Sequence, residues 1–349
     1  MNEVHRIDLP RIVLIGRGVI ESLGDVFQEL GLQRPLLVTG RKTYEIAGRR
    51  VQNILKDEGF EPIVAFCSRA DLNTVERVRK QAAATNVDSV IGVGGGRTID
   101  VAKLSAEKSQ AFFISAPTTA AHDGIASSLA SVKGLGRPYS LKAVSPIAVL
   151  ADSRIVAESP YRFTASGCGD VISKAVSVRD WRLAHEENGD YYGEYAGSLA
   201  LMSSNLVMRN AKLIGERTEE GYRTLLEALV SCGVAMSIAG SSRPCSGSAH
   251  LFSHTLDMLV PDAALHGEQC GVGAIMMAKL HGVDWQALRE SLRIIGAPTN
   301  AKELEIEADT IVEALVKARE IRPERYTILS KAKLTHENAR DLARECGIL

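Results

Sequence analysis

Residues 89–108 read SVIGVGGGRTIDVAKLSAEK, and this segment indicates what kind of fold to expect. A short apolar run breaks at three consecutive glycines, Gly94, Gly95 and Gly96, and then continues with apolar residues at helical spacing. A strand that passes through glycines into a helix favours a nucleotide-binding sheet, because backbone N–H groups and the helix dipole can then approach a phosphate. A tight turn without any ligand is the alternative interpretation.

The same alternation of strands and helices extends over the first 150 residues. Strand-like runs occupy residues 11–16, 35–40, 61–67 and 111–117, and helical patterns occupy residues 18–31, 43–60 and 73–86. This alternation predicts βαβ units and a Rossmann-like parallel sheet. Residues 128–150 instead alternate over short distances, and their turn residues Gly134, Gly136 and Pro138 predict an added β-hairpin.

From about residue 159 onward the strand-like runs vanish and amphipathic helical patterns dominate. We therefore expect two domains: an α/β nucleotide-binding domain over residues 1–158 and an all-α domain over residues 159–349, joined by a short linker at residues 152–160.

The composition excludes several classes of function. Lys and Arg total 41 against 42 Asp and Glu, so no long-range field would gather nucleic acid or an anionic membrane. No run reaches about 18 uncharged apolar residues, so membrane insertion is not expected. The six cysteines are scattered without a CxxC pair, which predicts buried thiols in a reducing cytoplasm. A homo-oligomer is expected from base rates alone.

Two segments are candidates for binding a dinucleotide. The glycine cluster has the spacing GGGxxxD, with Asp100 as the acid, instead of GxGxxG. Gly40 and Arg41 end a strand where NAD-specific enzymes often place an acid, so NADP is expected alongside NAD. A second polar loop follows the strand at residues 111–117. It contains Thr118, Thr119, His122, Asp123 and Ser127, and helix capping is its alternative explanation.

A third group of residues suggests a metal. His250 and His254 lie four residues apart and would share one helix face, and His266 follows, so three of the eight histidines fall in one short window. Asp170 follows two glycines near an expected helix start. At such a position a carboxylate often only stabilises the positive end of the helix dipole and binds no metal. An aspartate with two histidines would give a divalent ion three ligands and open positions, as in catalytic zinc sites. Scattered core or surface histidines are the alternative.

Together the ordered motifs identify a family. GGGRTIDVAK, TTAAHDGIASS, SGCGDVISK, SGSAHLFSHTLD and ALHGEQCGVG, with the closing EIRPERYTILSKAKLT, resemble the sn-glycerol-1-phosphate dehydrogenases over nearly the whole chain. That family belongs to the iron-alcohol-dehydrogenase and dehydroquinate-synthase-like superfamily. The resemblance implies the fold of that superfamily and NAD(P)H-dependent reduction of dihydroxyacetone phosphate to sn-glycerol 1-phosphate, the backbone of archaeal ether lipids.

The resemblance also implies roles for individual residues. Metal ligation of one Zn²⁺ per subunit falls to Asp170, His250 and His266, and substrate contacts fall to Asp123, Asp170 and His254. The implied cofactor contacts are Gly96, Arg97, Thr98, Ile99, Asp100, Thr118, Thr119, Ala120, Ala121 and Ser127. Iron-dependent alcohol dehydrogenases carry a third histidine ligand one turn after the aspartate, where this chain has Lys174. The three-ligand, zinc-favouring version is therefore expected.

Three candidate catalytic residues follow. His254 could bring a proton to the developing alkoxide, since the ordinary pKa of histidine suits that task, while Asp123 could orient a substrate hydroxyl. Lys174, four residues after Asp170, either forms a structural salt bridge or faces the substrate phosphate. Arg243 could likewise bind phosphate or be a surface residue.

Three other functions stay open on the residues alone. One is a glycerol dehydrogenase that acts on unphosphorylated polyols, and another is a dehydroquinate-synthase-like lyase that recycles NAD within each turnover. The third is a non-catalytic nucleotide sensor.

Overall fold

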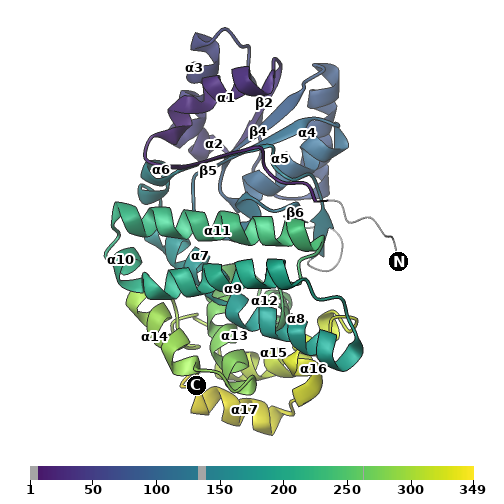
Figure 1. Cartoon of the computed structure of the whole chain (residues 1–349), viewed down its shortest axis with the longest axis vertical. Helices are drawn as coiled ribbons and strands as arrows, with labels where there is room; N and C mark the ends of the chain where they lie inside the picture. Colours follow the sequence, from purple (N-terminus) through teal and green to yellow (C-terminus); the bar gives the residue numbers. More distant parts are fainter. Residues whose placement is uncertain (1–6, 133–138, 262) are drawn as a thin grey trace. The chain divides into compact units, whose positions relative to one another are not determined.

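The computed structural model describes residues 7–132, 139–261 and 263–349 (Figure 1). The chain divides into two compact units, Met1–Pro160 and Tyr161–Leu349. The predicted turn residues Gly134, Gly136 and Pro138 lie outside the described residues.

The first unit is built on a six-stranded sheet in which every pairing is parallel. Its strands are β1 (Ile12–Gly16), β2 (Pro35–Thr39), β3 (Ile63–Phe66), β4 (Ser89–Gly94), β5 (Phe112–Pro117) and β8 (Ala148–Asp152). Their order across the sheet is β1-β8-β5-β4-β2-β3. A separate antiparallel pair, β6 (Leu129–Val132) and β7 (Tyr139–Lys142), forms the added hairpin. The predicted α/β class and the hairpin are confirmed.

Both faces of the sheet are covered by helices, as the continuous apolar strands require. The helices are α1 (Leu23–Leu30), α2 (Arg41–Thr43), α3 (Arg49–Asp57), α4 (Leu72–Ala84), α5 (Gly96–Lys108) and α6 (Ser153–Ala157). Side chains alternate between the two faces, so Leu36 packs in one core with α4 and α5, while its neighbour Leu37 packs in the other with α1 and α3.

The strand order reverses between β2 and β4. From β2 the chain moves outward to β3, and it then returns to the other side of β2 as β4 before continuing to β5 and β8. Ligands of open α/β sheets bind beyond the carboxyl ends of the strands at such a reversal. At this reversal β2 ends at Thr39, just before Gly40, and its neighbour β4 ends at Gly94, just before Gly95.

The linker predicted at residues 152–160 is wrong for most of its length. Asp152 ends β8, and its carboxylate accepts hydrogen bonds from the backbone N–H groups of Arg154 and Ile155, which start α6. The same carboxylate accepts from the N–H groups of Gly18 and Ile20, after β1. No local pattern of residues indicates that one buried aspartate orders this segment from both sides.

In the described residues of the second unit every regular element is a helix, as predicted. Its helices are α7 (Tyr161–Ile172), α8 (Lys174–Asn188), α9 (Glu194–Arg209), α10 (Ala211–Gly215), α11 (Glu219–Ala239), α12 (Ser248–Leu259), α13 (His266–Leu280), α14 (Trp285–Ile295), α15 (Ala308–Ile321), α16 (Ile328–Ala332) and α17 (His336–Glu345). Helix α11 is long and apolar enough to cross a membrane, but 72% of its apolar window is buried inside the structure.

Helices α7 and α13 touch backbone to backbone. A Cβ added to Gly267 would lie 1.8 Å from the carbonyl oxygen of Ser166, and one added to Gly169 would lie 2.2 Å from the carbonyl oxygen of Gly267. Neither position has room for a methyl group, since backbone atoms cannot move aside as a flexible side chain can. These two glycines therefore fix how α13 sits on α7.

The substitution Gly267→Ala should lower the free energy of unfolding by about 1–3 kcal/mol through overpacking, despite the better helix propensity of alanine. Gly273→Ala on the same helix is the matched control, because its added Cβ meets mainly the Phe252 ring, 2.8 Å away, which can shift. Urea unfolding of both variants checks this; equal losses would show that the backbone contact has no special weight.

Candidate functional site

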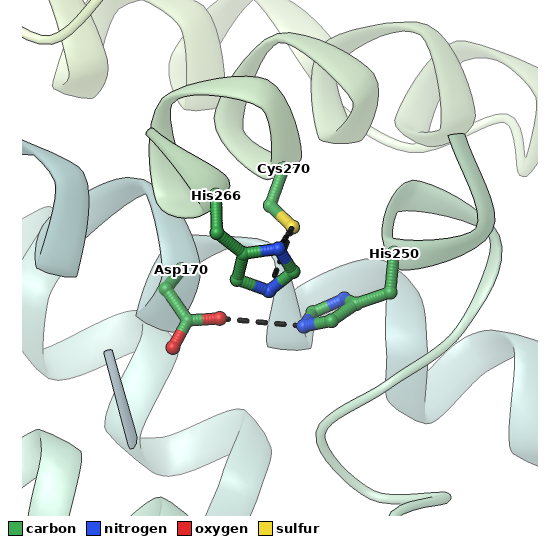
Figure 2. A group of neighbouring side chains, drawn as sticks. All are labelled: Asp170, His250, His266 and Cys270. Atoms are coloured by element: carbon green, nitrogen blue, oxygen red, sulfur yellow. Dashed lines mark hydrogen bonds and ion pairs between the residues drawn. The ribbon is translucent and has the colours of Figure 1, made fainter. Parts of the chain in front are cut away.

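Four potential metal ligands converge in the second unit. One ligand atom each from Asp170 on α7, His250 on α12, and His266 and Cys270 on α13 lie within 4.8 Å of one another (Figure 2). The three residues expected from the sequence are thus brought together. Cys270 was missed, although it lies four residues after His266 and would share its helix face.

Asp170 lies in the last turn of α7, so the predicted helix-start position is wrong. The carbonyl end of a helix disfavours a carboxylate. Lys174 compensates with its Nζ, 2.6 Å from Oδ1 of Asp170, and both side chains are almost fully buried. Burial alone would raise the pKa of Asp170, but the Lys174 ammonium and the His250 imidazole hold it well below its usual range. The carboxylate is therefore ionised and able to bind a cation.

A chain of hydrogen bonds sets the tautomer of His266. The Gln269 amide donates through Nε2 to Asp257 (3.0 Å), so its Oε1 accepts the Ser253 hydroxyl (2.6 Å). Because that bond uses the only Ser253 hydrogen, Nδ1 of His266, 3.0 Å from Ser253 Oγ, must be the donor to it. When the ring is neutral, Nε2 of His266 then carries the lone pair that a metal requires. None of these partners is a metal ligand, and spacing alone did not reveal them.

His250 is also a neutral ligand. Its Nε2 lies 3.3 Å from Oδ1 of Asp170, and its buried Nδ1 has no hydrogen-bond partner among the described residues. Burial, followed by the charge of Lys174, lowers its pKa to about 3. An ionised carboxylate, two imidazoles and a thiol suit a divalent ion that prefers nitrogen, oxygen and sulfur ligands. The residues present therefore fit a metal of this kind.

His254 stands beside the cluster without belonging to it. Its ring stacks on His266 with centroids 5.6 Å apart, and its Nδ1 has no hydrogen-bond partner within the described chain. Burial, and then the neighbouring His266 and His250, lower its pKa well below the usual value. The argument from an ordinary histidine pKa is therefore wrong, and His254 is a neutral imidazole at pH 7. It offers one donor and one acceptor to a ligand.

Arg243 is neither a free phosphate ligand nor a solvated surface residue. Its Nη1 donates to the carbonyl oxygen of Tyr326 at 2.9 Å, and its Nη2 pairs with the carboxylate of Asp190. The side chain is only 13% exposed. Its guanidinium is thus already committed to internal partners, which disfavours the predicted role in binding phosphate.

In the first unit, the glycine cluster forms the start of α5 at the reversal between β2 and β4. Gly95 is the N-cap of this helix, and no side chain caps it. A Cβ on Gly96 would lie 1.9 Å from Nε2 of His122, and one on Gly94 would lie 2.6 Å from Oγ1 of Thr98. An uncapped helix start leaves backbone N–H groups for an anion, which fits the pyrophosphate of a dinucleotide.

The other predicted cofactor residues differ in accessibility. Gly95, Gly96, Arg97, Thr119 and Ala121 are exposed or partly exposed, whereas Gly94, Thr98, Ile99, Asp100, Thr118, Ala120 and Ser127 are buried. A buried residue here can shape the strand ends and the helix start, but it presents little surface to a ligand. Burial, partly offset by Lys103, raises the pKa of Asp100.

Lys103 is a buried ammonium that holds the polar loop in place. Its Nζ donates to the carbonyl oxygens of Gly124 at 2.7 Å and Leu129 at 2.6 Å. Burial lowers its pKa to about 8, against the pull of Asp100 and Asp123. Asp123 itself opens a short 3-10 helix (Asp123–Ile125), where Nδ1 of the preceding His122 accepts a hydrogen bond from Gly124. We expected a cofactor role for this loop, but the sequence did not predict that Lys103 would anchor it.

Comparison with known proteins identifies close relatives. The model of the iron-containing alcohol dehydrogenase family matches residues 14–160. The glycerol-1-phosphate dehydrogenase [NAD(P)+] of Thermococcus kodakarensis is 51% identical over 347 residues, which cover 99% of each chain. The enzyme of the same name from Methanosarcina mazei is 50% identical, over 98% of this chain and 96% of that one. Among solved structures, a probable glycerol dehydrogenase from Sinorhizobium meliloti shares the fold, with a TM-score of 0.79, 24% identity and 98% coverage of both chains.

Removing the Ser253 hydroxyl should weaken metal binding. In Ser253→Ala the Nδ1–H of His266 loses the hydroxyl that accepts its hydrogen bond. The loss of a hydrogen-bond partner behind a metal-binding histidine typically lowers metal affinity about 10- to 100-fold. Competition with a chelator for Zn²⁺ measures this without any assay of activity. Thr255→Val, on the same helix, is the control, because among the described residues its hydroxyl bonds only the Leu251 carbonyl oxygen. Equal affinities in the two variants would contradict the proposed tautomer.

Removing the Lys174 ammonium should destabilise the metal-free protein. Lys174→Met leaves the buried Asp170 carboxylate without this partner, which should lower the free energy of unfolding by about 3–5 kcal/mol. Added Zn²⁺ should restore more stability to this variant than to the wild type, because the ion supplies the missing positive charge. Thermal unfolding with and without Zn²⁺ tests this. Lys212→Met, in the exposed pair with Glu216, should change little.

Proposed function

This chain belongs to the family of glycerol-1-phosphate dehydrogenases, and from that premise we propose that it reduces dihydroxyacetone phosphate to sn-glycerol 1-phosphate with NAD(P)H. The observation that carries the proposal is the buried cluster of Asp170, His250 and His266, which matches the need of a carbonyl reduction for a positive centre beside the reacting oxygen. The fold, shared with dehydrogenases of polyols and alcohols, is consistent with this reaction.

The cofactor in this proposal is NADH or NADPH, which supplies the hydride. Its pyrophosphate would rest on the uncapped start of α5, with Gly95 and Gly96 providing the close approach. Thr119 and Ala121, which are partly exposed on the following loop, would line the same site. Arg41 is exposed just beyond β2. An acid at this place would repel the 2′-phosphate of NADPH, so an arginine here supports use of both NADH and NADPH.

The metal in this proposal is one Zn²⁺ per subunit, held by Asp170, His250 and His266. When bound, such an ion supplies Lewis acidity toward a substrate oxygen. The thiol of Cys270 within the same cluster supports zinc over a hard, oxygen-seeking ion. Asp170 brings one negative charge to the site, and imidazoles that bind an ion add none, so this ligand set would leave a bound ion with net positive charge to attract an oxygen.

The remaining residues orient the substrate and handle the proton. His254, a neutral imidazole stacked on His266, would hydrogen-bond a substrate hydroxyl and so orient it. In the oxidation direction its ring nitrogen would accept the proton only as a weak base and pass it on, because its pKa is lowered. Asp123 would orient a second hydroxyl. Lys174 would act through its charge on Asp170, which it contacts directly. This last assignment favours the salt-bridge interpretation over contact with the substrate phosphate.

We further infer that the enzyme works in the cytoplasm as a homo-oligomer and supplies the glycerophosphate backbone of ether lipids. All six cysteines are free and buried, which is consistent with a reducing compartment.

The test is oxidation of NADH and NADPH with dihydroxyacetone phosphate, before and after chelation and readdition of Zn²⁺. We expect activity to be lost on chelation and restored by the ion, with sn-glycerol 1-phosphate as the product, assigned by enantiomer-specific enzymes. Dihydroxyacetone is the control substrate. Equal activity on it would make the protein a dehydrogenase of unphosphorylated polyols, and turnover without net loss of NAD(P)H would make it a lyase.

A further inference from the structure

The closing motif, residues 320–335, carries two arginines with no role in the chemistry described so far. Arg322 caps the carboxyl end of α15, and Arg325 follows in the connection to α16. Helix α15 packs against α12, the helix that carries His250 and His254. The motif therefore places two guanidinium groups next to the helix of the metal cluster.

Arg325 is held rigidly. Its Nη1 donates to the carbonyl oxygen of Ser246 at 2.5 Å, and its Nη2 donates to Oγ of Ser242 at 2.8 Å. Both acceptors belong to the segment just before α12. A guanidinium has five N–H donors, so this anchoring leaves several for a ligand. Arg322 makes no hydrogen bond or ion pair with any residue in the described ranges and is only partly exposed.

The acids that act on Arg325 are Glu324 and Asp180, and neither forms an ion pair with it within the described chain. A third cation, Arg243, also acts on Arg325. The carboxylate of Asp190 is already paired with Arg243, so it is not available to Arg325. The Asp180 carboxylate accepts hydrogen bonds from the backbone of Ser248 and Ile328. Burial, and then the charges of Arg322 and Arg243, lower the pKa of Arg325 to about 9. A partly buried group of like charges with unused donors is a site for an anion.

The arginine pair also lies close to the group expected to contact the substrate. Arg322 and Arg325 both act electrostatically on the His254 imidazole. In dihydroxyacetone phosphate only one carbon and one ester oxygen separate the carbonyl carbon from phosphorus. A substrate whose reacting end meets His254 and the metal ligands must therefore keep its phosphate near them.

We propose that Arg322 and Arg325 form the subsite for the substrate's phosphate, with Arg325 as the fixed half of the clamp and Arg322 as its free half. This assignment rests on the proposed function, and it makes the two arginines the residues that select phosphorylated over unphosphorylated substrate. Planar guanidinium forks bind phosphate oxygens in pairs, which suits this task.

The experiment compares Arg322→Gln and Arg325→Gln with the wild type, all loaded with Zn²⁺. The ratio of kcat/KM for dihydroxyacetone phosphate to that for dihydroxyacetone should fall about 10- to 100-fold in each variant, the usual effect of a lost charged hydrogen bond. Arg344→Gln is the matched control, because Arg344 is exposed on α17 and its loss changes the net charge equally. Titration calorimetry with inorganic phosphate should show weaker binding to both variants than to the control.

Each outcome decides the matter. A ratio and a phosphate affinity that stay at the control's values in Arg322→Gln would overturn the subsite. Because this variant removes no hydrogen bond to any described residue, a fall in both values would report the lost charge and not a loss of folding. A rise in KM for NADPH, with that for dihydroxyacetone phosphate unchanged, would also overturn it, since the anion would then belong to the cofactor. If the wild type itself fails to prefer the phosphorylated substrate, the proposed function fails. In that case the calorimetry still tests the anion site, because it measures phosphate binding to Arg322 and Arg325 independently of turnover.

Discussion

The close approach of α7 and α13 is the constraint on which the metal cluster depends. Gly169 and Gly267 touch through backbone atoms, and each is adjacent in sequence to a candidate ligand, Asp170 in one case and His266 in the other. A ligand next to such a contact has little freedom, because its Cα position is set by two helices that cannot separate or slide without losing their packing. The distance between carboxylate and imidazole is thus determined by backbone geometry more than by side-chain rotamers.

This arrangement has an electrostatic cost, since it buries a carboxylate at the carbonyl end of a helix. Lys174 offsets that cost from the next turn. Lys174 thus supplies a fixed positive charge one turn after the carboxylate. The charge keeps Asp170 ionised when no metal is bound, and the site is therefore organised before an ion arrives.

The sequence predicted those parts of the structure that local patterns encode. Apolar runs alternating with helical patterns gave the parallel sheet, and the spacing of His250 and His254 placed both on α12. It misplaced Asp170, because Gly169 suggested the edge of a helix, whereas the helix continues through it and uses its missing side chain to meet α13. The hydrogen bond between Ser253 and His266 and the one between Arg243 and Tyr326 each join two separate segments of the chain. Hydrophobic periodicity describes single elements and therefore does not reveal such pairings.

Burial, reinforced by the cations around the cluster, lowers the pKa of His250 and of the neighbouring His254. Lys174 disfavours protonation of His250, and Arg322 and Arg325 do the same for His254. A neutral imidazole is what a metal requires, and it is also what a hydroxyl requires as a hydrogen-bond acceptor. An acidic surrounding would stabilise imidazolium and repel an anionic substrate. The positive charges that add to the effect of burial on these imidazoles therefore also favour a phosphorylated substrate, so one distribution of charge contributes both to metal binding and to substrate choice.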